Sequence, residues 1–336
     1  MKKEDSTLFV KKLVACSQIK GKKLFYNLLR KTFKIGQRLG LHIIPNHYYF
    51  PVPDTRTLNN ETFLRHNKLL GIDINEKTQL ELLALFESNY KEEFNKFPRH
   101  KTRVPYQYYS DNGNFRSIDG EVLYSMIRHF KPKLIIEIGS GFSTFCSAQA
   151  IIRNKNLDHN YECKLICIEP YPNKVLKKKF PGLTKVIEQK VQNIPTSIFK
   201  KLTENDILFI DSSHILNIKS DVYYEFLEII PKTNKGVLIH IHDIFLPLEY
   251  PKKWVLDLLR FYNEQYLLQS FLAFNNNFKV LWASKYMQIN HSDKLVNIFE
   301  SYKRDLLHTN NNLYFQANGL TYPIEWPSSF WIKRIK

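Results

Sequence analysis

The sequence predicts an α/β fold built on a doubly wound, mostly parallel sheet. Short runs rich in Ile, Leu and Val recur from residue 134 onward, and helical patterns separate them. These runs carry little internal polarity, which is typical of parallel strands covered by helices on both faces. Expected strands are 134–138, 165–168, 185–188, 207–210 and 237–241, and the runs 278–283 and 329–335 can complete the sheet.

A helical and loop-rich extension precedes this sheet. Between residues 19 and 39, apolar residues recur at spacings of three and four, which predicts a helix with one apolar stripe. Further helices are expected at 75–96 and 118–130. The expected organisation is a basic amphipathic segment at 1–40, a helical and loop-rich extension at 41–115, and the sheet domain at 116–336. The stripe consists of Leu24, Phe25, Leu28, Leu29 and Phe33.

The positive charge is concentrated near the start of the chain. The 336 residues contain 49 Lys and Arg against 32 Asp and Glu, a formal net charge of +17. Residues 1–40 hold 11 Lys and Arg against two acidic residues, so they account for +9 of that charge. A basic amphipathic helix can lie on an anionic membrane surface, or it can dock on a core with its basic face in solvent. Both interpretations of residues 19–39 remain open.

The composition excludes several protein classes. Hydrophobic residues make up 43% of the chain, a globular fraction, and no apolar run approaches the ~20 residues of a membrane-spanning helix. The residues 13–16 resemble a lipoprotein cleavage box, but Lys11 and Lys12 interrupt the apolar stretch that a signal peptide requires. We therefore expect a cytoplasmic protein with reduced thiols, located either free or at the inner face of the membrane.

Polar or charged residues follow four of the five central strands. Ligands of open parallel sheets bind beyond the carboxyl ends of the strands, so these positions are the candidates for a site. Gly139 and Gly141 after the first strand permit a tight turn and close approach of a ligand to the backbone. Glu169, after the second strand, is suited to accept hydrogen bonds from a ribose diol. The fourth and fifth strands are followed by Asp211, His214, His242 and Asp243.

The glycine motif favours a ligand without phosphates. Thr144 stands where a dinucleotide fingerprint has its third glycine, and the chain has no G-x-x-x-x-G-K-[ST] phosphate loop. Glu137, two residues before the first glycine, suits a ligand with a cationic amino-acid end. S-adenosylmethionine is such a ligand.

Three motifs in order resemble the class I S-adenosylmethionine-dependent methyltransferases. They lie at 136–144, 209–214 and 241–245, and they resemble most the subgroup that includes macrolide sugar O-methyltransferases and bacterial glycan-cluster enzymes. The resemblance covers about residues 115–285 and implies a Rossmann-like methyltransferase domain at 116–336. It implies that the cofactor is held by Glu137, Gly139, Ser140, Gly141, Ser143, Glu169 and Asp211.

The same resemblance implies catalytic roles for residues after the fourth and fifth strands. His214 becomes the general base, with Asp211 and Asp243 beside it as catalytic residues and metal ligands. Metal-dependent sugar enzymes of this kind have a carboxylate where this chain has His242. Because imidazole is a poor ligand for Mg²⁺, His242 is assigned only as a tentative ligand, and the ion is left open between Mg²⁺, a softer divalent ion and none.

The sequence therefore predicts an O-methyltransferase that acts on a sugar hydroxyl of a glycan, glycolipid or glycosylated metabolite. A basic RNA-binding protein or RNA methyltransferase is the alternative that the net charge suggests, although nucleic acid is disfavoured because the chain has no recognised RNA-binding module. A hydroxylase using Asp211, His214 and His242 around iron ranks lower. The oligomeric state is not predicted.

Overall fold

The computed structural model describes residues 19–47, 49–307, 314–317, 320–323 and 325–336. The chain divides into two compact units, 1–59 and 60–336. The predicted extension at 41–115 contains this division. No helix within the described ranges is both long enough and apolar enough to cross a membrane. Cys16 and the cleavage-box residues lie outside the described residues.

The described residues of the first unit contain a long helix, α2 (Ile19–Arg38), and a short 3-10 turn, η1 (Thr55–Thr57). α2 matches the helix expected at 19–39. On this helix Leu28 and Ile35 lie seven residues apart, hence on one face, and are 61% and 56% exposed. Arg30, Lys31 and Lys34 are exposed as well.

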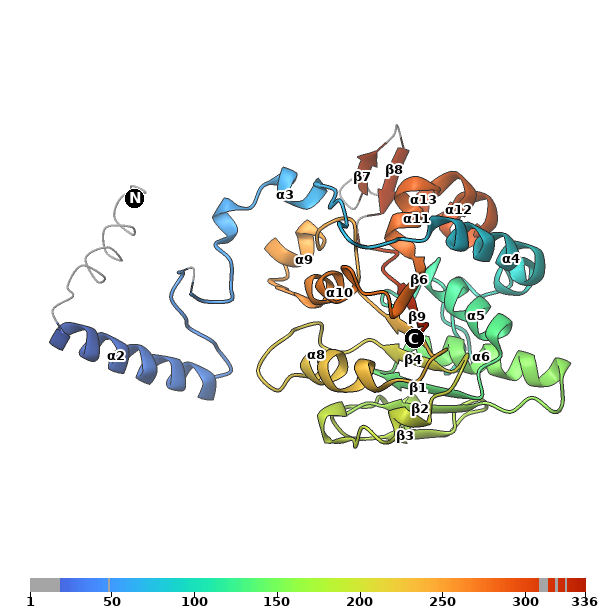
Figure 1. The fold of residues 1–336 in the computed structure, drawn as a ribbon, viewed down its shortest axis with the longest axis horizontal. Helices are drawn as coiled ribbons and strands as arrows, with labels where there is room; N and C mark the ends of the chain where they lie inside the picture. Colours follow the sequence, from blue (N-terminus) through green and yellow to red (C-terminus); the bar gives the residue numbers. More distant parts are fainter. Residues whose placement is uncertain (1–18, 48, 308–313, 318–319, 324) are drawn as a thin grey trace. The chain divides into compact units, whose positions relative to one another are not determined.

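The second unit is built on a seven-stranded sheet with the order β3-β2-β1-β4-β5-β9-β6 (Figure 1). The strands β1 to β5 are parallel, and β9 is antiparallel to both of its neighbours. This confirms the predicted fold class. The strands are β1 (Leu134–Ile138), β2 (Lys164–Ile168), β3 (Lys185–Ile187), β4 (Ile207–Ile210), β5 (Leu238–Ile241), β6 (Phe278–Ala283) and β9 (Phe330–Arg334).

Helices cover both faces of this sheet and form two apolar cores. One core packs α4, α5 and α6, together with α11 to α13, against one face. The other packs α8, the π-turn after it and α10 against the opposite face. The helices of the second unit are α3 (Asn60–Leu64), α4 (Glu76–Phe94), α5 (Asp119–Phe130), α6 (Phe142–Leu157), α7 (Lys174–Lys177), α8 (Asp221–Tyr224), the π-turn η4 (Glu225–Ile229), α9 (Lys252–Leu256), α10 (Glu264–Leu272), α11 (Ser284–Asn290), α12 (Ser292–Ile298) and α13 (Glu300–Leu307).

A second, two-stranded sheet is the small hairpin of β7 (Tyr314–Ala317) and β8 (Leu320–Pro323). The pattern of apolar residues does not predict this hairpin, nor the helices α11 to α13 that precede it. β9, in contrast, is a predicted strand, and its place between β5 and β6 closes the sheet.

Candidate functional site

The carboxyl ends of four parallel strands lie at one level. Ile138 pairs with Ile168 on one side and with Ile210 on the other, and Ile210 pairs in turn with Ile241. Because these four residues end their strands in register, the residues that follow them face the same space. The register therefore brings together the residues that the strand-end rule selected from the sequence.

The loop after β1 is fixed by Gly139. Its φ angle is +79°, a left-handed conformation that side-chain-bearing residues avoid, and a Cβ atom there would lie 1.8 Å from the carbonyl oxygen of Asp211. Gly141, in contrast, faces open space: a Cβ built on it has no heavy atom within 4 Å. The first glycine thus permits close packing of β1 against β4, and the second leaves the backbone accessible to a ligand.

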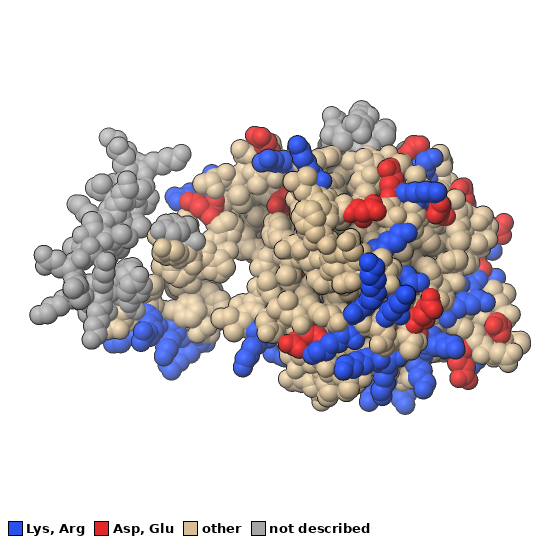
Figure 2. Space-filling view, in the orientation of Figure 1, with Lys and Arg blue, Asp and Glu red and all other residues tan. Residues whose placement is uncertain are grey.

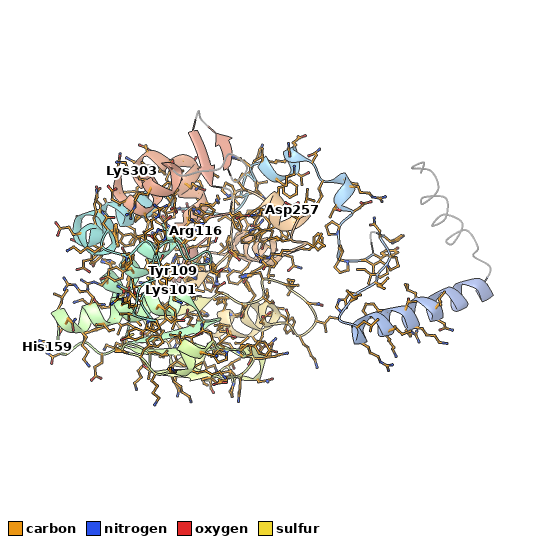
Figure 3. The ribbon with its side chains drawn as sticks, turned by 180° about the vertical axis from the view of Figure 1, so that it is seen from behind. Lys101, Tyr109, Arg116, His159, Asp257 and Lys303 are labelled. Carbon is orange, nitrogen blue, oxygen red and sulfur yellow. The ribbon has the colours of Figure 1, made fainter. Side chains whose placement is uncertain are left out.

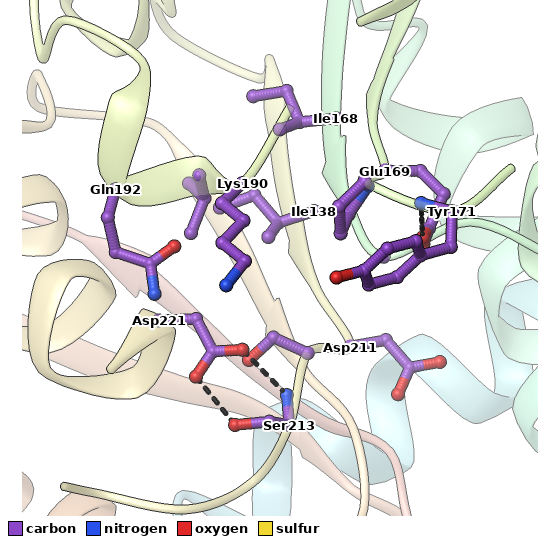
Figure 4. A pocket seen from close by; sticks show the side chains of 13 residues that line it. Ile138, Ile168, Glu169, Tyr171, Lys190, Gln192, Asp211, Ser213 and Asp221 are labelled. Atoms are coloured by element: carbon purple, nitrogen blue, oxygen red, sulfur yellow. Dashed lines mark hydrogen bonds between the residues drawn. The ribbon is translucent and has the colours of Figure 1, made fainter. Parts of the chain in front are cut away.

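A cavity of about 460 Å³ opens beyond β1, β2 and β4 (Figure 4). Of the predicted cofactor residues, Gly139, Glu169 and Asp211 line it. The carboxylate of Glu169 accepts hydrogen bonds from the backbone N–H groups of Ser140, at 3.3 Å, and Tyr171, at 2.7 Å. The wall is rich in carboxylates, which suits a ligand with a cationic end. Four residues that were not predicted from the sequence also line the cavity: Tyr171, Lys190, Gln192 and Asp221.

Glu137 and Ser143 lie behind the loop rather than on the cavity wall. The hydroxyl of Ser143 donates to Glu137 at 2.5 Å, and the thiol of Cys167 lies 3.4 Å from the same carboxylate. Burial raises the pKa of Glu137 to about 7 despite these hydrogen bonds. In this arrangement the two residues support the glycine loop from inside the protein.

His214 lies among three carboxylates. Its Nε2 atom is 3.4 Å from Asp211 Oδ1 and 3.3 Å from Asp243 Oδ2, and its Nδ1 atom is 2.8 Å from Glu264 Oε2. The side chain is only 6% exposed. Both His214 and Asp243 have left-handed φ angles, +61° and +54°. Two such residues in contact are the kind of local strain that functional sites hold.

The carboxylates control the protonation of this histidine. Burial alone would lower the pKa of His214, but the charges of Asp243, Asp211 and Glu264 outweigh it and raise the pKa well above the ordinary value. Asp211 responds in the opposite sense: burial would raise its pKa, but His242 and His214 lower it to about 2. The site therefore favours an imidazolium flanked by carboxylates.

Comparison with known proteins relates this geometry to a reaction. Residues 136–244, which include the glycine loop and the ends of β4 and β5, match a family model described as a methyltransferase domain. A protein of Archaeoglobus fulgidus, named only as uncharacterized, is 32% identical over 189 residues, which cover 54% of this chain and 82% of that protein. The chain belongs to this methyltransferase family. It is an S-adenosylmethionine-dependent methyltransferase of class I.

A solved structure is also similar to part of this methyltransferase. It is titled as a putative protein-L-isoaspartate O-methyltransferase of Plasmodium falciparum in complex with S-adenosyl-L-homocysteine. The match covers 49% of this chain and 83% of that one, with 14% identity and a TM-score of 0.28. A score this low does not relate the two structures in detail.

The side chains around Asp211 and Asp243 do not form the metal site that was predicted. Within the described ranges, no three His, Cys, Asp or Glu side chains are grouped to hold a metal ion. The imidazole of His214 lies between Asp211 and Asp243, 3.4 and 3.3 Å from their oxygens, while His242 Nε2 is 3.7 Å from Asp243 Oδ1. The prediction of Asp211, Asp243 and His242 as ligands is therefore not supported, and neither is the iron set of Asp211, His214 and His242.

Sequence reasoning also missed Glu264, which holds the buried ring nitrogen of His214. Glu264 begins α10, 50 residues after His214, and no role was predicted for it from the sequence. It missed an aromatic cluster at the same place: the ring of Tyr262 lies 4.9 Å from that of His214, and Trp254 and Tyr250 both pack edge-on against Tyr262. In the methyltransferase these rings form one wall beside the histidine.

Proposed function

We propose that this methyltransferase methylates a sugar hydroxyl of a glycan, glycolipid or glycosylated metabolite, with His214 as the general base. The observation that carries the proposal is the position of His214. Its imidazole contacts Asp211, and Asp211 also lines the cavity of Glu169 and Gly139. A base and the donor cavity thus share one wall, as transfer of a methyl group to a hydroxyl requires.

The chemistry assigned to the chain is proton removal and orientation. When bound, S-adenosylmethionine supplies an electrophilic methyl group. His214 would take the proton of the acceptor hydroxyl as the O–C bond forms and the S–CH3 bond of the sulfonium breaks, with S-adenosylhomocysteine as the leaving group. Asp211 and Asp243 stabilise the imidazolium that results. Glu264 hydrogen-bonds Nδ1 of His214, which leaves Nε2 as the atom that takes the proton. Positioning the acceptor in line with the donor supplies a large further part of the rate.

The aromatic wall supports a sugar as the acceptor. Tyr262 and Trp254 are partly exposed beside His214. Apolar ring faces with polar rims suit the C–H faces and hydroxyl edges of a pyranose. This agrees with the sequence resemblance to sugar O-methyltransferases.

Glu169→Ala tests the cofactor site directly. Loss of hydrogen bonds to a charged group costs about 1.5–3 kcal/mol, so we expect S-adenosylmethionine to bind about 10–100-fold more weakly to the variant in isothermal titration. Glu188→Ala is the matched control, because Glu188 follows the neighbouring strand β3 but is exposed and paired with Lys177. Absence of binding by the unmodified protein, or equal binding by both variants, would contradict the proposed site.

Glu264→Gln separates a positioning role from a structural one. The active base is the neutral imidazole, which is populated only above the pKa of His214. Activity should therefore rise with pH, and the rising limb of the pH–rate profile should lie above neutral pH. Removing one of the three anions lowers that pKa, so the limb should move to lower pH while kcat falls by about tenfold. Glu121→Gln is the control, since Glu121 is a buried carboxylate bonded to Ser301. An unshifted limb would remove Glu264 from the mechanism.

One observation supports RNA as an alternative substrate. Between residues 174 and 201 the chain has eight lysines, all exposed, and Glu188 is its single acidic residue there. These residues surround β3, and Lys190 lines the donor cavity. RNA affinity that falls steeply with salt, together with methylation of RNA, would favour this candidate over the sugar. Affinity that is weak or insensitive to salt would remove it.

Peripheral contact of residues 19–39 with an anionic membrane, at its cytoplasmic face, stays a proposal. It is supported by the exposed Leu28 and Ile35 on a helix that carries Arg30, Lys31, Lys34 and Arg38. Co-sedimentation with vesicles containing anionic lipid should depend on residues 1–40. Equal sedimentation of a variant that lacks them would overturn the proposal.

A further inference from the structure

A second cavity lies beyond the β5 end of the sheet. Its volume is about 500 Å³, and its walls come from three places in the second unit: residues 62–70, residues 246–249 after β5, and the first turns of α10. The lining residues include Arg65, His66, Lys68, Glu249, Gln265 and Tyr266. None of them belongs to the donor cavity.

The cavity is connected to His214 through two short segments. Glu264 bonds His214, and the next residue, Gln265, lines the cavity. Residues 246–249 follow Asp243 by a few positions on the same loop. In the sheet, β5 lies on the opposite side of β4 from β1 and β2, whose ends form the donor cavity. The two cavities therefore lie on opposite sides of β4, and the side away from the donor cavity is the one left for the acceptor.

Hydrogen bonds hold the walls together. The backbone N–H of Asn67 donates to the carbonyl of Pro247 at 2.7 Å, and its side-chain amide donates to Gln269 at 2.9 Å. These bonds join the 62–70 segment to both other walls. A cavity built in this way is formed before a ligand arrives, which favours binding.

The charges on the walls are unbalanced. Arg65, His66 and Lys68 are exposed, and none of them forms an ion pair with another described residue. The acidic lining residue, Glu249, accepts hydrogen bonds from Tyr266 at 2.5 Å and Gln265 at 3.1 Å. These two donors on α10 are neutral, so Glu249 is not paired with Arg65 or Lys68. Figure 2 shows Lys and Arg side chains near α3, with acidic side chains among them.

We propose that this cavity binds an anionic group of the acceptor, a carboxylate or a phosphate, while the hydroxyl to be methylated lies at His214. The guanidinium of Arg65 can donate two parallel hydrogen bonds to either group, and Lys68 adds a point charge. The inference rests on the proposed function and names its substrate class: an acidic sugar, as in a uronic acid, or a phosphorylated one.

The test uses the full chain and three probes: glucuronic acid, glucose 1-phosphate and glucose, each titrated by NMR with and without S-adenosylmethionine. We expect the charged probes to bind at least about tenfold more tightly than glucose, and Arg65→Gln/Lys68→Gln to remove that preference. The two charged probes decide between a carboxylate and a phosphate. Lys101→Gln/Arg103→Gln is the control, since both residues are exposed on another loop; Figure 3 labels Lys101.

The outcomes separate this inference from the proposed function. If the unmodified protein shows no preference for the charged probes, or if the double variant keeps it, the anionic subsite is wrong even when methyl transfer to a neutral sugar is observed. If S-adenosylmethionine does not bind but the charged probes do, the subsite stands and the proposed function fails. Unchanged cofactor affinity in both double variants shows that they are folded.

Discussion

Replacing His214 with alanine is expected to lower kcat by about 10²–10⁴-fold, the usual contribution of a general base. Binding of S-adenosylmethionine should change little, because the residues that line the donor cavity remain. Single-turnover methyl transfer and isothermal titration measure the two quantities separately. His159→Ala is the control, since His159 lies exposed in the loop between α6 and β2 (Figure 3).

The buried position of His214 requires a second variant. Alanine leaves Asp211, Asp243 and Glu264 with His242 as the remaining imidazole beside the two aspartates, which costs stability at neutral pH. His214→Asn keeps a polar group that can donate to a carboxylate but cannot serve as a base at neutral pH. If it melts close to the unmodified protein and still lacks activity, the loss is chemical. Methylation at the unmodified rate by either variant would refute the assignment.

Gly139→Ala is expected to destabilise the protein by at least about 2–3 kcal/mol and to abolish cofactor binding. The added Cβ would require a left-handed alanine and would overlap the carbonyl oxygen of Asp211 at 1.8 Å, so β1 and β4 must separate. Urea unfolding measures the first effect and isothermal titration the second.

The matched control for this change is Gly113→Ala. Gly113 has a similar φ angle, +83° against +79°, but a Cβ there meets nothing within 4 Å. Its free energy of unfolding should fall only by the cost of a left-handed alanine, about 1 kcal/mol. The difference between the two variants isolates the steric contact between the loop and Asp211. Equal losses would show that this contact is not important.

The fold was predictable because its strands are buried on both faces. Runs such as 207–210 are wholly apolar, so their pattern cannot be confused with an amphipathic surface helix. Residues 314–323 lack such a run, and their pairing as β7 and β8 was not predicted.

The candidate site was predictable only where strand ends define it. Asp211, His214 and Asp243 come together because β4 and β5 end in register. Glu264 reaches His214 from a helix distant in sequence, and Arg65 lines the second cavity from a separate segment. The strand-end rule selects neither residue. The metal prediction came from family resemblance, which does not show that an imidazole lies between the two carboxylates.

The position of β9 has a consequence for how the domain forms during synthesis. β9 lies between β5 and β6, and among the described strands β6 pairs with β9 alone. A nascent chain that has emerged through β6 therefore has an incomplete sheet with an open edge at β5, and open edges invite pairing with other chains. The sheet closes only when residues 330–334 leave the ribosome. We expect the domain to complete its folding only after residues 330–334 have been synthesised, in a step slowed by this long-range contact.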